Sequence, residues 1–219
     1  MPVPVDEATV NVTNWLVDAH IAANRGDRTA LQFGDRRYTY HDLAALANRA
    51  GHLLRRCGAA GEDRLLLALR ESPAFFGLLL GAMKIGVAPV IVPVVTGRGA
   101  FTSAVVQSQP KVAVVEPAWI DEVESARPGL EIIVAGEGVG SRPSLAIRLR
   151  EMPSSLVAER VAETTPAFVV AVRDVLLTAS HGQLRVALTG GQVPNDLAGL
   201  ELLEHLQRLR LGDEIVIRR

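Results

Sequence analysis

Eight residues near the C-terminal end of the sequence, from Thr178 to Arg185, are the ones best suited to chemistry. They read TASHGQLR and combine two hydroxyl side chains, one glycine and one arginine. Backbone N–H groups can cradle a phosphate where glycine allows close approach, and arginine can bind two phosphate oxygens at once. Because Gly182 is the one glycine and Arg185 the one cation, the stretch predicts at most weak binding of a phosphate group.

Other reactive side chains are poorly placed for catalysis. Ser180 and His181 are direct neighbours, so their side chains point apart and do not form a nucleophile and base pair. The histidines have no i,i+4 spacing and form no cluster with cysteine, as a metal site would require; they are His20, His41, His52, His181 and His205. We therefore expect no catalytic residue and no metal site.

Composition narrows the class of protein. The 219 residues are 48% hydrophobic but only 4% aromatic, which predicts a sizeable core of alanine, valine, leucine and isoleucine in one large or two small domains. The net charge of −1 gives no reason to expect binding to nucleic acid or to an anionic membrane. The single cysteine, Cys57, suits a reducing compartment, and the first ten residues do not resemble a secretion signal. We expect a cytoplasmic protein.

The long apolar stretch from Phe75 to Val95 is better explained by a globular fold than by a membrane span. Its length would suffice to cross a bilayer. However, Lys84 lies near its centre, and Pro89 and Pro93 follow. A buried helix that ends at Gly86 and a buried strand after it fit this pattern better.

The first 135 residues alternate between helical and strand patterns. Such alternation is typical of right-handed crossovers and predicts a layered α/β fold, with a mostly parallel sheet and helices on both faces. Gly34–Asp35 marks a hairpin between the first two strands. The predicted strands are 29–33, 37–40, 63–69, 87–95, 111–115 and 131–135, and the predicted helices are 13–24, 40–57, 73–86, 100–108 and 118–126.

The remaining residues are less regular. Residues 136–165 form a loop-rich connection in which 144–161 is moderately helical. Residues 166–177 read as a buried strand, with Arg173–Asp174 as a point where it could be interrupted. Residues 178–192 are expected to be a loop, followed by an amphipathic helix over 195–210 and a last strand over 214–217. We expect 1–135, 136–165 and 166–219 to form one compact domain.

Two long stretches resemble the N-terminal subdomain of the acyl- and aryl-CoA ligase, adenylate-forming superfamily. The first, residues 27–58, has a strand pair, then Tyr-Thr-Tyr-x-x-Leu and a long helix. The second, residues 62–93, has a Ser-Pro helix start, Gly-Ala-x-Lys-x-Gly and a strand ending in Val-Pro. The sequences of these two stretches are most similar to those of benzoate-CoA-ligase-like members. These stretches bear the fold rather than the chemistry.

The resemblance also suggests a role for the eight residues from Thr178 to Arg185. PAFVV, residues 166–170, resembles the strand that feeds the family's phosphate loop, and Thr178 to Arg185 resembles that loop. The usual form is Thr-Ser-Gly-Thr-Thr-Gly-x-Pro-Lys-Gly. The resemblance implies nucleotide-binding roles for Thr178, Ser180, His181, Gly182, Gln183 and Arg185. The loop is degenerate, because most glycines are missing and an arginine replaces the lysine.

The functional expectation is a truncated ligase-like domain that is not catalytic alone, with no firmly assigned cofactor and weak binding of ATP or AMP with Mg²⁺ at most. One alternative is the N-terminal part of an active ATP-dependent acid–CoA ligase, completed by another chain or a longer protein. A second is a docking or scaffold module of a biosynthetic assembly line. We also expect apolar surface on the last helix and in residues 75–95 to be covered by a partner or a second copy.

Overall fold

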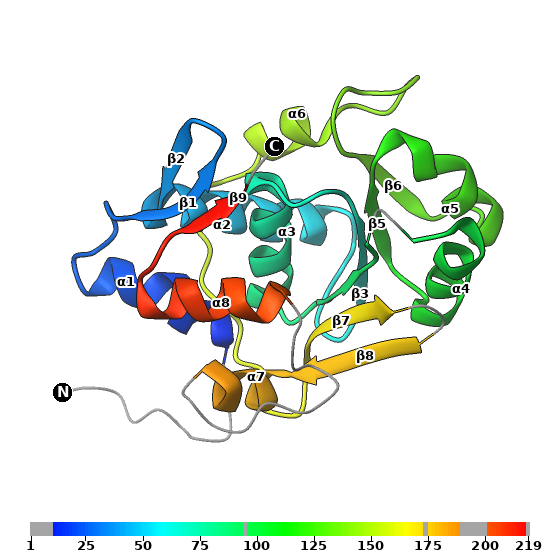
Figure 1. Ribbon diagram of the computed structural model, residues 1–219. Helices are drawn as coiled ribbons and strands as arrows, with labels where there is room; N and C mark the ends of the chain where they lie inside the picture. The colour runs from blue at the N-terminus through cyan, green and yellow to red at the C-terminus, as the bar shows by residue number, and fades with distance from the viewer. Residues whose placement is uncertain (1–10, 94–95, 173–174, 189–200, 218–219) are drawn as a thin grey trace.

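The computed structural model describes residues 11–93, 96–172, 175–188 and 201–217. They form two sheets, one of six strands and one of three, with helices packed between and around them (Figure 1). The six-stranded sheet has the order β6-β5-β3-β4-β7-β8. The three-stranded sheet has the order β2-β1-β9. The predicted layered α/β class is confirmed.

The large sheet is parallel except at one edge. Neighbouring strands from β6 through β7 run parallel, whereas β8 pairs with β7 antiparallel. Crossover helices connect β3 to β4, β4 to β5 and β5 to β6, as the alternating pattern predicts. The strands are β3 (Arg64–Ala68), β4 (Ala88–Ile91), β5 (Val112–Val115), β6 (Glu131–Val134), β7 (Pro166–Val172) and β8 (Val175–Ser180).

Helices cover both faces of this sheet, so its strands are apolar on both sides. Alternate residues of β3 divide between two core clusters: Leu65 and Leu67 face one, and Leu66 and Ala68 face the other. The first cluster includes residues of α2 (Tyr40–Arg56), α3 (Pro73–Lys84), α6 (Leu145–Arg150), α7 (His181–Leu188) and α8 (Glu201–Leu211). The second includes residues of α4 (Arg98–Ser108) and α5 (Ile120–Ala126), which follows the short 3-10 turn η2 (Pro117–Trp119).

The paired helices α2 and α3 form the centre of the first cluster. Thr39 caps α2 in a reciprocal arrangement with Asp42, and Ser72 caps α3 with Pro73 at its first position. A Cβ at Gly81 would lie only 2.4 Å from the backbone oxygen of Ala47, so glycine is required for the helices to approach this closely. α3 is buried along its whole apolar length.

The small sheet joins the two ends of the described chain. β1 (Thr29–Phe33) pairs antiparallel with β2 (Arg36–Thr39) and parallel with β9 (Ile215–Ile217). Before β1 lie a π-helical turn η1 (Asn14–Asp18) and α1 (Ala19–Ala22). The Tyr40 hydroxyl donates to the Leu209 carbonyl oxygen at 2.8 Å, which fixes α8 against the start of α2.

The structure corrects the bounds of two expected elements. The strand expected over 166–177 is two strands, β7 and β8, which pair antiparallel because the chain reverses between Val172 and Val175, at the interruption that the sequence allowed. The helix expected over 144–161 ends at Arg150, shortly before Pro153, which cannot continue it. Phe75 to Met83 of α3 are buried within the chain, and so are four leucines of the described part of α8: Leu202, Leu203, Leu206 and Leu209. A partner that covers apolar surface stays a prediction.

Candidate functional site

The segment predicted to be a phosphate loop is a strand end and a helix start. Thr178, Ala179 and Ser180 pair with Val169, Phe168 and Pro166 in the ladder between β8 and β7. His181 begins α7, which continues past Arg185 to Leu188. The prediction of a loop is therefore wrong for residues 178–188, and residues 189–192 lie outside the described part of the chain. Small polar side chains suggested a loop, but pairing with β7 holds them in a strand.

The backbone N–H groups at this junction all have partners within the protein. The amide of Ser180 donates to Gln183 Oε1 at 2.9 Å, and the amide of Gln183 donates to Ser180 Oγ at 3.2 Å. The amides of His181 and Gly182 donate to the carbonyl oxygens of Thr165 and Glu163, at 2.9 and 2.8 Å. These four successive donors cap α7 and tie it to the segment that precedes β7.

The predicted site residues divide between surface and interior. Ser180, Gly182, Gln183 and Arg185 line a surface pocket of about 360 Å³ together with Glu163, whose carboxylate forms an ion pair with Arg185. Thr178 is exposed and is not among the lining residues of that pocket.

His181 is fully buried, and its Nδ1 accepts a hydrogen bond from the backbone amide of Val12 at 3.3 Å. Burial lowers the pKa of His181 to about 4, so the ring is neutral at pH 7, with its proton on Nε2. The structure therefore gives His181 the environment of a core residue instead of an exposed phosphate ligand.

The carboxyl edge of the large sheet is the other place where a ligand is expected. The crossovers from β3 and β5 leave in opposite directions, and ligands of open α/β sheets bind outside such a point. Here Glu116, just after β5, accepts hydrogen bonds from both the backbone amide and Nε of Arg70, just after β3, each at 3.0 Å. This pair bridges the two strand ends.

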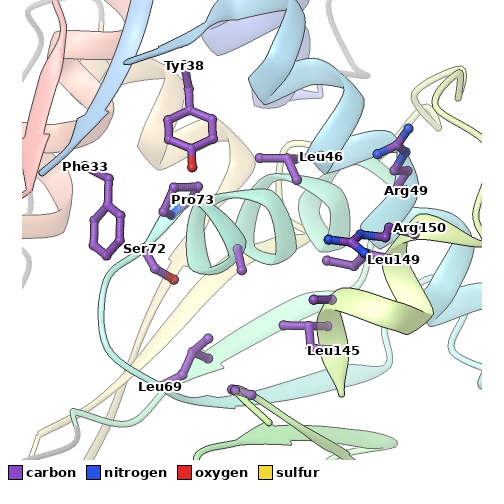
Figure 2. A pocket seen from close by; sticks show the side chains of 14 residues that line it. Phe33, Tyr38, Leu46, Arg49, Leu69, Ser72, Pro73, Leu145, Leu149 and Arg150 are labelled. Atoms are coloured by element: carbon purple, nitrogen blue, oxygen red, sulfur yellow. The ribbon is translucent and has the colours of Figure 1, made fainter. Parts of the chain in front are cut away.

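A cavity of about 460 Å³ lies beside this edge, between the small sheet and the large one. We call it the Arg49–Arg150 cavity. Figure 2 shows its walls, which come from the β1–β2 hairpin, α2, the β3–α3 loop with the start of α3, and α6. Ala135 and Gly136, directly after β6, complete the lining. Its lining residues are Phe33, Tyr38, Leu46, Arg49, Leu69, Ser72, Pro73, Ala74, Ala135, Gly136, Leu145, Ala146, Leu149 and Arg150.

No pattern in the sequence predicts this cavity. Its two arginines lie on different helices and are separated by about a hundred positions in the chain, so no local motif links them. The folding of α6 across α2 brings them to one cavity. Only a three-dimensional arrangement, or an alignment of related sequences, could have pointed to it.

A third pocket, of about 310 Å³, opens on the other side of the β3–α3 loop. Glu71 and Glu201 are among its lining residues, and Glu71 Oε1 lies 3.4 Å from Nδ1 of His205 on α8. This contact raises the pKa of His205, mainly through the hydrogen bond with Glu71, in opposition to partial burial.

The described ranges are 11–93, 96–172, 175–188 and 201–217. Among them, no group of three or more His, Cys, Asp or Glu side chains is arranged to hold a metal ion. None of the helices described is both long enough and apolar enough to cross a bilayer.

Comparison with proteins of known sequence shows partial relatives. The chain is 29% identical over 119 residues to acetyl-coenzyme A synthetase of Bacillus subtilis, covering 52% of this chain and 21% of the relative. It is 27% identical over 139 residues to the 4-hydroxybenzoate–CoA/benzoate–CoA ligase of Rhodopseudomonas palustris, covering 62% and 25%. The matched region is thus about a quarter or less of each relative.

Solved structures show the same fold over nearly the whole chain. An anthranilate CoA ligase in complex with anthranoyl-AMP matches with a TM-score of 0.82 at 17% identity, over 96% of this chain and 45% of that one. A benzoate CoA ligase from Burkholderia xenovorans matches with a TM-score of 0.79 at 18% identity, over 95% and 45%. The chain spans about half the length of these structures, and at such identity the likeness concerns the fold.

The sequence pattern of the AMP-binding enzyme family matches residues 18–171, which is most of the chain. That range contains the Tyr-Thr-Tyr and Ser-Pro stretches that carried the resemblance, and it ends within β7. The resemblance to acyl- and aryl-CoA ligases is confirmed: this chain belongs to the AMP-binding enzyme family.

Proposed function

We propose that this chain is a ligase-fold domain that does not adenylate a carboxylic acid by itself. One observation carries the proposal. β7 ends at Val172 and β8 begins at Val175, and the two strands pair antiparallel along their length. Only two residues of sequence separate them, so the strand beginning PAFVV leads directly into β8 and not into a glycine-rich phosphate loop. That motif does not fit between these paired strands.

The junction of β8 and α7 offers no substitute for the loop. A phosphate cradle needs several backbone N–H groups directed at the ligand. The amides of residues 180–183 instead donate to Gln183, Thr165, Glu163 and Ser180. The carboxylate of Glu163, beside Arg185, would also repel a phosphate. These contacts support a structural role for residues that the resemblance assigned to nucleotide.

Calorimetric titration with ATP and Mg²⁺ tests the proposal, with a full-length benzoate CoA ligase as the positive control. We expect no binding heat at millimolar ATP, and no difference between the wild type, Arg185→Ala and the control Arg127→Ala. Micromolar binding that Arg185→Ala abolishes and Arg127→Ala preserves would contradict the proposal. That result would favour the alternative, the N-terminal part of an active ligase completed by another chain or a longer protein.

The docking-module alternative has a separate test, because it requires self-association or a partner. Among the described residues that suggested it, Phe75 to Met83 of α3 and the α8 leucines from Leu202 to Leu209 are buried within the chain. We therefore expect a monomer in light scattering up to about 100 μM, a concentration within the micromolar to millimolar range in which exposed apolar surface drives association. A stable dimer at low micromolar concentration would restore the docking hypothesis.

A further inference from the structure

The Arg49–Arg150 cavity has a charge pattern that differs from that of a neighbouring pocket. Its only charged lining residues are the two arginines, and none of the described residues that line it is Asp or Glu. In the adjacent pocket below α6, each arginine has an acidic partner: Arg148 Nη1 lies 2.7 Å from Glu131, and Arg56 Nη1 lies 3.6 Å from Glu151. The lining of the Arg49–Arg150 cavity is therefore positively charged, whereas the arginines of the adjacent pocket are paired with glutamates.

Burial of the Arg49 Nε–H group costs free energy, and no hydrogen bond to a described neighbour offsets that cost. Its Nε atom is buried, and among the residues that the structure describes it has no hydrogen-bond partner. A buried donor without a partner loses its hydration without compensation, so such groups commonly mark the position of a ligand, a water molecule or an ion. Arg150, at the end of α6, is exposed and faces the same cavity (Figure 2).

The rest of the wall is mostly apolar, with two hydroxyl groups. Leu46, Leu69 and Leu149 are among the side chains that provide the apolar surface. The Ser72 hydroxyl accepts a hydrogen bond from the amide of Phe75, which leaves its O–H free to donate. Tyr38 supplies the other hydroxyl from β2 (Figure 2). Apolar walls with a few converging polar groups are typical of small-molecule sites.

We propose that the Arg49–Arg150 cavity binds a small apolar molecule that carries one anionic group. The guanidinium groups of Arg49 and Arg150 bind the anion, and the leucine-lined part of the cavity takes the apolar body. The volume of about 460 Å³ lies within the range of roughly 300–1,000 Å³ of known ligand pockets. Its walls come from separate segments of the chain and leave one side open to solvent, which suits a compact molecule better than a protein helix laid on a flat face.

This site is separate from the residues that the resemblance assigned to nucleotide. The pocket beside Arg185 shares no lining residue with the Arg49–Arg150 cavity; it is lined by Glu163, Thr164, Ser180, Gly182, Gln183, Arg185 and Val186. The proposal therefore does not depend on whether the chain binds ATP. Both arginines of the proposed site, Arg49 in α2 and Arg150 in α6, belong to the described part of the chain.

The test compares matched probes that differ in charge. Calorimetry or ligand-observed NMR measures the binding of 2-naphthoate, 2-naphthalenesulfonate and the neutral 2-naphthamide to the wild-type protein. We expect both anions to bind, and to bind at least about tenfold more tightly than the amide, because a charge-assisted hydrogen bond contributes more than a neutral one. Similar affinity for the carboxylate and the sulfonate indicates recognition of charge, while a preference for one identifies the anion that fits.

Arginine variants locate the anion, with one control for each arginine. Arg49→Gln, compared with the partly exposed Arg127→Gln, is expected to weaken 2-naphthoate binding about tenfold or more. Arg150→Gln, compared with the exposed Arg160→Gln, is expected to weaken it by roughly three- to tenfold, because its charge is screened by solvent. Neither substitution is expected to change the affinity for 2-naphthamide.

A variant that fills the cavity shows whether weaker binding comes from the cavity itself or from loss of the fold. Ala146 is exposed and lines the cavity from α6, so Ala146→Phe adds bulk without changing the core. We expect it to weaken all three probes while leaving the unfolding temperature within a few degrees of the wild type. The proposal is overturned if 2-naphthoate shows no binding at millimolar concentration, binds no better than the amide, or is unaffected by the three cavity variants.

Discussion

Lys84 and Asp18 form an ion pair that joins the end of α3 to the π-helical turn near the start of the described chain. Lys84 Nζ lies 2.9 Å from Asp18 Oδ2 and 3.0 Å from Oδ1. The lysine side chain is 3% exposed and the aspartate side chain 33% exposed. The same lysine interrupts the apolar stretch that could suggest a membrane span, and the pair shows how its charge is accommodated inside the fold.

Removing one partner of this pair is expected to cost more than removing the other. Asp18→Asn leaves a buried ammonium group without a counter-charge, and we expect it to lower the free energy of unfolding by about 3 kcal/mol. Lys84→Met leaves a partly hydrated carboxylate and fills the space with an apolar chain, so we expect a loss of about 1 kcal/mol or less. Urea unfolding of the two variants and of the double variant measures both values. Equal losses would contradict the asymmetry.

We expect Gly182 to be required for packing against Glu163 and not for binding phosphate. A Cβ at this position would lie 3.0 Å from Glu163 Cβ and 3.1 Å from Glu163 O. We therefore expect Gly182→Ala to destabilise the fold by about 1–3 kcal/mol. Gly99→Ala is the control, because a Cβ there meets nothing within 4 Å and alanine favours the helix by up to about 1 kcal/mol. Thermal unfolding of both variants gives the comparison; a stable Gly182→Ala protein would contradict it.

Stability is expected to fall on acidification because of His181. Its pKa is lowered to about 4 by burial, whereas in the unfolded chain it returns to the ordinary value near 6.5. Between these values the unfolded chain binds a proton that the folded protein does not. The contribution to stability is therefore complete above pH 6.5 and decreases by roughly 3 kcal/mol as the pH falls to 4.

The variant His181→Gln isolates this contribution, because glutamine can keep an acceptor for the Val12 amide. Urea unfolding at pH 7 and pH 5 is compared between the wild type and the variant. We expect the wild type to lose more stability than the variant over this interval. Parallel losses in the two proteins would show that His181 is protonated in the folded state.

The contribution of His205 to stability is expected to have the opposite pH dependence to that of His181. The hydrogen bond with Glu71 raises its pKa, with further attraction from Glu201 and opposition from burial and Arg208. Its contribution to stability is therefore present below the unfolded pKa and is lost as the pH rises through the folded value. An NMR titration should show a pKa above 6.5 in the wild type and a lower one in Glu71→Gln. Glu201→Gln, at an exposed position, should have a smaller effect.

The regular elements of the first 135 residues were predictable because each carries its own local signals. The helix 40–57 and the strand 111–115 appear as α2 and β5 within a residue or two of the expected bounds. A capping threonine, an apolar stripe and Gly58 delimit the helix, and an unbroken apolar run marks the strand. These features act within a few residues, so a single sequence reveals them.

The end of the large sheet and the cavities were not predictable for the same physical reason. The reversal of the chain between Val172 and Val175 depends on the pairing of β8 with β7, and the same pairing holds Thr178 to Ser180 in a strand. The proximity of Arg49 and Arg150 likewise follows from the packing of α6 on α2. Contacts between distant segments leave no periodic pattern in either segment, so local interpretation of residues 178–185 favoured a loop.

The parallel pairing of β1 with β9 has a consequence for synthesis of the protein. Leu31 pairs with Ile215, so the second partner is translated 184 residues after the first. At about 5–20 residues per second, the N-terminal hairpin waits roughly 10–40 seconds on the ribosome before its neighbouring strand exists. During that interval the edge of β1 is open to other nascent chains. Chaperone binding to ribosome-bound intermediates should therefore begin soon after residue 40 emerges and end only when β9 has left the exit tunnel.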